Sequence, residues 1–250
     1  MESSVKHIKP GDYIFDIVKK DYRTADVFRK YQIDYCCGGK WPLSMICETK
    51  QIETAAILEE LNRSVQDVPF SQMIDVTKWG IDFLADFITH MHHDYFKVAL
   101  PDTIALTKSF TAKHEKQLPQ LQKLNGLLQE LSGTILEGVK RKDEILFPYV
   151  RQIAHAYLSK ETYARLLART LRKPLEEPMQ AENRNVVEML SQIRQCTNDY
   201  TPPPNACISH RVTFARLQEL HNVIQHNRYM EQDVLYPKAL AIERELTLAE

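Results

Sequence analysis

The sequence predicts an all-α protein, with a small N-terminal helical domain followed by an up-down bundle of four long helices. Apolar residues recur at spacings of three and four over long stretches, as in Ile81, Leu84 and Ile88. Glycine is scarce, with 7 in 250 residues. A signature of an aliphatic pair, an aromatic residue and a proline occurs twice, at 145–148 and 234–237. The repeated signature indicates two helices that belong to one bundle.

The N-terminal part predicts four short helices around a glycine-containing turn. Apolar spacing places helices at 12–21 and 24–31, a third starts at Pro42-Leu43, and a fourth covers 52–62. Four short helices make a small module that is marginally stable alone. We therefore expect an N-terminal domain at 1–64, a linker at 65–77 and the bundle at 78–250.

The remaining sequence predicts the four long helices and their breaks. Helix one starts near Trp79, and the other three cover 119–157, 178–196 and 208–246. Pro101 should kink or end the first helix, and Pro148 should kink the second. The run 201–204, Thr-Pro-Pro-Pro, cannot be helical and separates the last two helices.

Composition excludes several classes of function. The formal net charge of −1 gives no electrostatic reason to expect nucleic acid as a partner. No apolar run approaches the roughly 20 residues that span a bilayer, and the first residues do not resemble a signal peptide. Five cysteines are an odd number, which favours free thiols in a reducing cytoplasm.

The two copies of the signature differ at the positions that would face the bundle interior. In di-metal bundles, an inward carboxylate lies one turn before the aliphatic pair, with a histidine one turn earlier. The second copy has Glu231 at the carboxylate position. The first copy has Lys142 there, and Gly138 at the histidine position.

Helical spacing limits which histidines can join Glu231. Residues four apart differ by roughly 40° in direction, so Asn227 and Glu231 share a face. His226 is five residues from Glu231 and shares its face only if the helix contains a π-bulge. On helix one, His93 continues an inward line, whereas His92 points elsewhere. His114 lies 21 residues beyond His93, roughly 31 Å along a continuous helix, so both cannot serve one site.

The turn at 36–39, Cys-Cys-Gly-Gly, is the second chemical feature. Adjacent cysteines form only a strained, easily reduced disulfide. The glycines and Lys40 could expose the Cys36 and Cys37 thiols and lower their pKa, which makes them redox candidates. The alternative is that both are small buried residues at a turn. The other three cysteines are interpreted as structural or incidental, namely Cys47, Cys196 and Cys207.

These features together resemble the Repair of Iron Centres family. Members are cytoplasmic, hemerythrin-like di-iron proteins associated with restoring iron–sulfur clusters damaged by nitric oxide or peroxide. The resemblance covers essentially the whole chain and implies an N-terminal cysteine-pair module before a four-helix bundle that binds two irons. It is carried by 28–31 with 34–40, His93-Asp94, 145–148, 201–204 with Cys207, and 231–237.

The resemblance assigns each family metal ligand to a position in this chain, and most of these positions are substituted. The helix-one histidine is His93, and the helix-four glutamate is Glu231. Another family histidine matches His114. The remaining ligand positions carry other residues, namely Gly138, Lys142, Asn183 and Asn227.

Two hypotheses follow for the bundle interior. In the first, the di-iron site has degenerated, and the Lys142 ammonium, which cannot ligate iron, pairs with Glu231. The alternative for Lys142 is that it extends to solvent. In the second, His93, His226 and Glu231 form a mononuclear site, a donor set that suits ferrous iron or zinc. Iron is the metal that the resemblance implies, and we expect zero or one ion per chain rather than two.

The resemblance implies repair of damaged iron–sulfur proteins in nitrosative or oxidative stress, without implying a defined turnover reaction. Two alternatives come from other classes of function. One is a metal-free paralogue that acts through protein interaction. The other is a thiol-based redox or nitric-oxide-responsive protein that uses Cys36 and Cys37. Exposed bundle faces are compatible with a homodimer.

Overall fold

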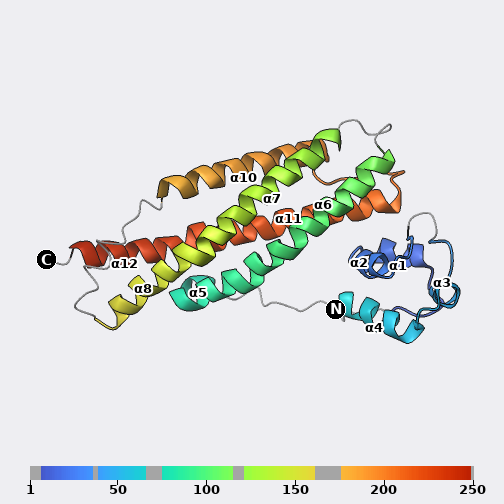
Figure 1. Ribbon diagram of the computed structural model, residues 1–250, viewed down its shortest axis with the longest axis horizontal. Coiled ribbons are helices and arrows are strands. Elements are labelled where there is room, and N and C mark those ends of the chain that lie inside the picture. Colours follow the sequence, from blue (N-terminus) through green and yellow to red (C-terminus); the bar gives the residue numbers. More distant parts are fainter. Residues whose placement is uncertain (1–6, 36–38, 66–74, 115–120, 161–175, 249–250) are drawn as a thin grey trace. The chain divides into compact units, whose positions relative to one another are not determined.

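The computed structural model confirms the all-α fold class (Figure 1). It describes residues 7–35, 39–65, 75–114, 121–160 and 176–248. Within those ranges the long elements are all helical, and the one β-type contact is an isolated bridge between Tyr13 and Pro42. No helix in these ranges is long and apolar enough to cross a membrane.

The chain forms two compact units, and the first contains the four predicted short helices. These are α1 (Ile14–Lys20), α2 (Thr24–Lys30), α3 (Leu43–Lys50) and α4 (Thr54–Ser64). Side chains from all four helices form a fully buried core, and these are Ile14, Phe28, Leu43, Cys47, Ile57 and Leu61. The prediction of four short helices in this part of the chain is confirmed.

The division between the units differs from the predicted domain limits. The first unit comprises 1–72 together with 200–217, and the second comprises 73–199 and 218–250. Arg216 makes an ion pair with Asp26 of α2 inside the first unit. The sequence-based limits placed 200–217 in the bundle; those limits remain a prediction.

The glycine-containing turn has a defined end at Gly39. The backbone N–H of Phe15 donates to the Gly39 carbonyl oxygen at 2.9 Å. A Cβ on Gly39 would lie 2.6 Å from the Tyr35 carbonyl oxygen, so only glycine fits this close approach. Cys36 and Cys37 lie outside the described residues.

The second unit is a helical bundle, and three of its four rods contain a short irregular segment among the described residues. The first rod contains α5 (Ile81–Ile88), η2 (Thr89–His93) and α6 (Asp94–His114). The second contains α7 (Gln122–Arg141), η4 (Lys142–Leu146) and α8 (Phe147–Leu158). The third is α10 (Glu176–Cys196). The fourth contains α11 (Ile208–Tyr229), η5 (Met230–Leu235) and α12 (Tyr236–Leu248). Residues 208–217, at the start of the fourth rod, belong to the first unit.

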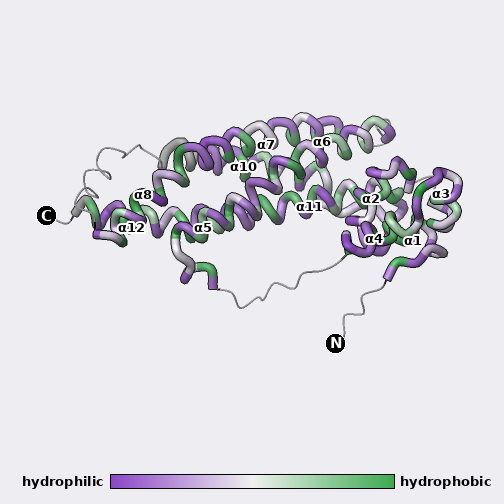
Figure 2. The backbone as a smooth tube through the Cα atoms, turned by 60° about the horizontal axis from the view of Figure 1, so that its bottom comes forward, coloured by the Kyte–Doolittle hydropathy of each residue, from purple (hydrophilic) through white to green (hydrophobic). Residues whose placement is uncertain are grey.

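Packing within this unit follows the order of the rods. Helix α7 lies against α6 and α10, while α8 lies against α5 and α12 (Figure 1). Hydrophobic and hydrophilic residues interleave along these helices in Figure 2, as expected for helices that bury one stripe. A buried cluster with Leu84, Ile88, Val150, Ile153 and Leu235 joins α5, α8 and the fourth rod.

The prolines have less effect on the helices than their sequence positions suggest. Of the two alternatives for Pro101, a kink or an end of the helix, the second is wrong, because α6 continues through Pro101 to His114. Pro148 and Pro237 each occupy the second position of a new helical segment, directly after η4 and η5. Proline is tolerated in a first turn because its missing N–H would have no partner there.

Candidate functional site

Three π-helical segments, η2, η4 and η5, interrupt three of the four rods of the bundle. Such segments are rare overall and enriched at functional sites. Each segment carries one residue of a shared buried cluster: His93 on η2, Lys142 on η4 and Glu231 on η5. The signature repeated in the sequence therefore marks the two segments η4 and η5.

Lys142 and Glu231 make a buried ion pair at the centre of this cluster. The Lys142 Nζ lies 2.8 Å from Glu231 Oε2. The Glu231 side chain is 1% exposed and the Lys142 side chain 11%. Lys142 therefore does not extend to solvent, and the contact is the one that the argument from charge compensation predicts.

Three further side chains contact the Glu231 carboxylate. His93 Nε2 lies 3.2 Å from Oε1, Asn227 Nδ2 donates to Oε1 at 3.1 Å, and the Tyr236 hydroxyl donates to Oε2 at 3.4 Å. Asn227 thus contacts Glu231 as their four-residue spacing predicts. Each of these four contacts of the carboxylate comes from a group that can donate a hydrogen bond.

Electrostatics keep both members of the pair charged. Burial would raise the pKa of Glu231, but the Lys142 ammonium and His93 outweigh burial and lower that pKa to about 2. Burial would lower the pKa of Lys142, but the charges of Glu231 and Glu182 outweigh it and raise the value. Burial and the nearby Glu231 charge raise the pKa of the Tyr236 phenol, so it stays a hydrogen-bond donor.

Glu182 of α10 completes the cluster, and the sequence analysis did not identify it. Its Oε1 lies 3.5 Å from Lys142 Nζ, and its Oε2 pairs with Arg141. The carboxylate occupies the space beside Gly138, where an added Cβ would collide with Oε1 and lie 2.8 Å from the carboxyl carbon. The available signal was a carboxylate next to Asn183 on helix three.

Asp143 is a second residue that the sequence analysis missed. Its Oδ1 lies 2.6 Å from His93 Nδ1, and its Oδ2 accepts a hydrogen bond from Lys97 at 3.3 Å. The fully buried His93 ring is thus held between Asp143 and Glu231. The cluster of alternating acids and bases, hereafter the ion network, contains Lys97, Asp143, His93, Glu231, Lys142, Glu182 and Arg141.

The structure does not bring His226 into the ion network. His226 Nδ1 lies 2.8 Å from His92 Nε2, whereas Asn227 takes the place beside Glu231. The π segment η5 is present in helix four, but it begins at Met230, after His226. Asn183 also lies apart, accepting from Arg228 Nε at 3.4 Å.

Burial disfavours the charged form of both members of the His92–His226 pair. Burial, followed by the nearby His226, lowers the pKa of His92 to about 4. Partial burial of the His226 ring, at its contact with His92, also lowers the pKa of His226. His92 lies 3% exposed, with its ring edge-on to Phe87, although its sequence position suggested that it faces away from the interior.

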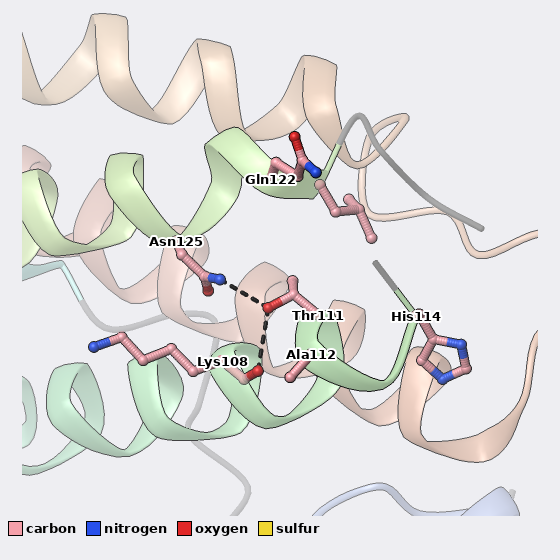
Figure 3. A pocket seen from close by; sticks show the side chains of 7 residues that line it. Lys108, Thr111, Ala112, His114, Gln122 and Asn125 are labelled. Atoms are coloured by element: carbon pink, nitrogen blue, oxygen red, sulfur yellow. Dashed lines mark hydrogen bonds between the residues drawn. The ribbon is translucent and has the colours of Figure 1, made fainter. Parts of the chain in front are cut away.

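His114 lies at the far end of α6 from His93, as the helix-length argument predicts. It lines a partly open pocket of about 520 Å³ with Lys108, Thr111 and Asn125 (Figure 3). Asn125 Nδ2 donates to Thr111 Oγ1 at 2.7 Å across this pocket. His114 is therefore not part of the ion network.

In the described part of the chain, no group of three or more histidine, cysteine, aspartate or glutamate residues is arranged to hold a metal ion. Cys47 and Cys196 are free thiols, and the Cys207 Sγ lies 3.1 Å from Ser209 Oγ.

Comparison with known proteins identifies two kinds of similarity. Residues 12–65 match a family model described as ScdA_N, a domain of unknown function (DUF542), and this range contains α1 to α4. Relatives named iron-sulfur cluster repair protein YtfE match most of the chain. The one from Citrobacter koseri is 29% identical, covering 88% of this chain and 93% of the relative. The one from Escherichia coli O8 is 28% identical with the same coverage.

Proposed function

Since the chain belongs to the Repair of Iron Centres family, we propose that it acts in iron–sulfur cluster repair as a member whose bundle has an ion network instead of a di-iron centre. The single observation that carries the proposal is the 2.8 Å contact between the buried Lys142 ammonium and Glu231. The name of its relatives supports a function in cluster repair, and the ion pair in the bundle supports the absence of a di-iron centre.

The donor set at the ion network does not fit two iron ions. A protonated lysine has no lone pair to offer a metal, and Lys142 is held protonated between Glu231 and Glu182. A histidine side chain at Gly138 would need the space that the Glu182 carboxylate fills. His93 is the one imidazole that contacts Glu231 among the described residues.

Electrostatics explain why the bundle remains stable with this arrangement. A carboxylate buried without a counter-charge costs several kcal/mol, and a bound cation normally offsets that cost in a metal site. Here a single ammonium offsets it, with hydrogen bonds from Asn227 and Tyr236 satisfying the remaining lone pairs. Lys142 thus compensates the buried negative charge as a metal ion would, but it provides no redox chemistry and no open coordination position.

A repair function without iron in the bundle would depend on protein contacts. We infer that the chain binds damaged iron–sulfur proteins, or a complete relative that serves them, in the cytoplasm under nitrosative or oxidative stress. A thiol function of Cys36 and Cys37 remains the alternative. Serine substitutions at both cysteines, followed by thiol titration and a cluster-repair assay, separate the two.

Elemental analysis of protein purified anaerobically with iron supplied tests the proposal. We expect no stoichiometric iron. Two irons per chain would overturn the proposal. About one iron per chain would also overturn it if that iron is lost in both His226→Ala and Glu231→Gln. That result would favour the site formed by His93, His226 and Glu231.

A variant with the family's ligands restored provides the positive control. It combines Gly138→His, Lys142→Glu, Asn183→His and Asn227→His, and we add Glu182→Ala to clear the space beside residue 138. Iron uptake by this variant, beside none in the natural chain, would show that the supplied iron was available. It would also show that the substituted positions are the cause of the difference.

A further inference from the structure

A second pair of facing imidazoles lies beside the ion network but outside it. His92 Nε2 and His226 Nδ1 are 2.8 Å apart, and their ring centroids are separated by 4.9 Å. His92 belongs to η2 and His226 to α11, so the pair joins the first and fourth rods of the bundle. Among the described residues, neither ring makes a hydrogen bond or ion pair with a carboxylate, in contrast with the neighbouring His93.

The separation of the two nitrogens is close to that of two ligands on one metal ion. With metal–nitrogen bonds of about 2.0–2.1 Å, two imidazole nitrogens lie about 2.9 Å apart at a right angle and about 3.3 Å apart at a tetrahedral angle. The observed 2.8 Å therefore requires a movement of only a few tenths of an ångström, together with a rotation of the rings.

Burial differs between the two rings in a way that suits a solvent-accessible site. His92 is 3% exposed and held by its edge-on contact with Phe87, at 5.8 Å between centroids. His226 is exposed. One ligand is thus fixed in the bundle wall, and the other leaves room for water molecules to complete the coordination of an ion.

We propose that His92 and His226 form a binding site for a divalent metal ion that prefers imidazole, of the copper and zinc class. Imidazole nitrogen suits copper, zinc and nickel, and copper(II) binds such donors most strongly among the divalent first-row metals. This site is distinct from the di-iron positions that the family resemblance assigns, none of which falls on His92 or His226. It does not depend on the proposed repair function.

The test uses the untagged full-length chain, stripped of metal by a chelator and alkylated to cap accessible thiols. Copper(II) is titrated against a competing chelator, and its electron paramagnetic resonance spectrum is recorded. We expect about one copper per chain, with hyperfine coupling from two imidazole nitrogens. We also expect zinc(II) to displace the copper when added in excess.

Two ligand variants and two controls locate the site. His226→Ala removes an exposed side chain, and His92→Phe keeps an aromatic ring against Phe87, so both should fold. Each should weaken copper binding at least about tenfold. His90→Ala, which removes an exposed histidine from the same segment, should bind as the natural chain does.

Glu231→Gln, measured under conditions where it is folded, should also keep the copper site, because Glu231 is not part of the pair. Unchanged copper affinity in His226→Ala, or an equal loss in His90→Ala, would overturn the proposal. A loss confined to Glu231→Gln would overturn it as well, because the ion would then lie in the ion network.

Discussion

The segments η4 (Lys142–Leu146) and η5 (Met230–Leu235) have the same local structure, but their inward residues have opposite charges. Both are π-helical, both end at a buried leucine, and both continue into a helix that starts with an aromatic residue and a proline. The inward residue is a lysine on η4 and a glutamate on η5, and these two residues bind each other.

The two segments share their backbone conformation and differ in the charge of the inward side chain. In both places the repeated signature coincides with a π segment and with a buried residue at or near the start of that segment. The charge of that residue then decides the chemistry, because two carboxylates would require a cation whereas a carboxylate and an ammonium satisfy each other. In this chain the lysine on η4 and the glutamate on η5 form an ion pair.

Lys142→Met removes the positive charge of η4 and leaves Glu231 charged, so it should have the largest effect. Glu231 and Glu182 would lose their shared ammonium, and breaking a buried pair in this way costs about 3–5 kcal/mol. Chemical denaturation at neutral pH would measure this loss. Lys140→Met, at an exposed position two residues earlier, should change stability by no more than about 0.5 kcal/mol.

The double variant Lys142→Met with Glu231→Gln shows whether the effect comes from the pair. Removing both charges leaves no uncompensated ion, so the double variant should be more stable than Lys142→Met alone. If Lys142→Met is no less stable than Lys140→Met, or if the double variant loses the sum of both single effects, Lys142 and Glu231 do not form a functional pair.

Glu231→Gln should change how stability depends on acid, with a somewhat smaller effect. The folded pKa of Glu231, about 2, is below its ordinary value of 4.5, so the carboxylate contributes stability above pH 4.5. This contribution, about 3 kcal/mol, should disappear as pH falls from 4.5 towards 2. The free energy of unfolding should thus differ most between the natural chain and the variant at neutral pH, and least near pH 2.

Denaturation curves at a series of pH values would measure that difference. Glu188→Gln, at an exposed position on α10, is the matched control and should differ little from the natural chain throughout. A constant gap between Glu231→Gln and the natural chain across the acid range would contradict the role of the buried charge. Lys142 affects the alkaline side of the pH dependence. Because its pKa is raised, its contribution to the free energy of unfolding declines only at pH values above about 10.5.

Helix positions were largely predictable because strong local signals define them. The proline run at 201–204 and the apolar stripes gave helices at 178–196 and 208–246, and the structure has Glu176–Cys196 and, with η5 inside, Ile208–Leu248. The π segments η2 and η4 were not predicted, because an extra residue in a turn has no composition of its own. The helix does not end at Pro101, because buried residues on both sides of it, such as Leu100 and Thr103, hold α6 in the bundle against the low helix propensity of proline.

The ion network was predictable only where one residue required another. A buried Glu231 requires a cation, which identified Lys142 from the sequence alone. Glu182 and Asp143 are also on inward or half-buried positions, but nothing in their own segments indicates which bases they meet. His92 was assigned to an outward direction because regular helical spacing was applied through η2, where π-helical geometry changes the direction of each residue.

Gly138 and Gly133 provide the finest test, since both lie on α7 and differ only in what faces them. Nothing lies within 4 Å of a Cβ on Gly133, so Gly133→Ala should stabilise the chain by about 0.5–1 kcal/mol through helix propensity alone. Gly138→Ala gains the same propensity but pushes Glu182 away from Lys142 and Arg141, so it should be less stable than Gly133→Ala. Thermal unfolding of the two variants would measure the difference. Equal stabilisation would mean that the position of the Glu182 carboxylate does not require a glycine at residue 138.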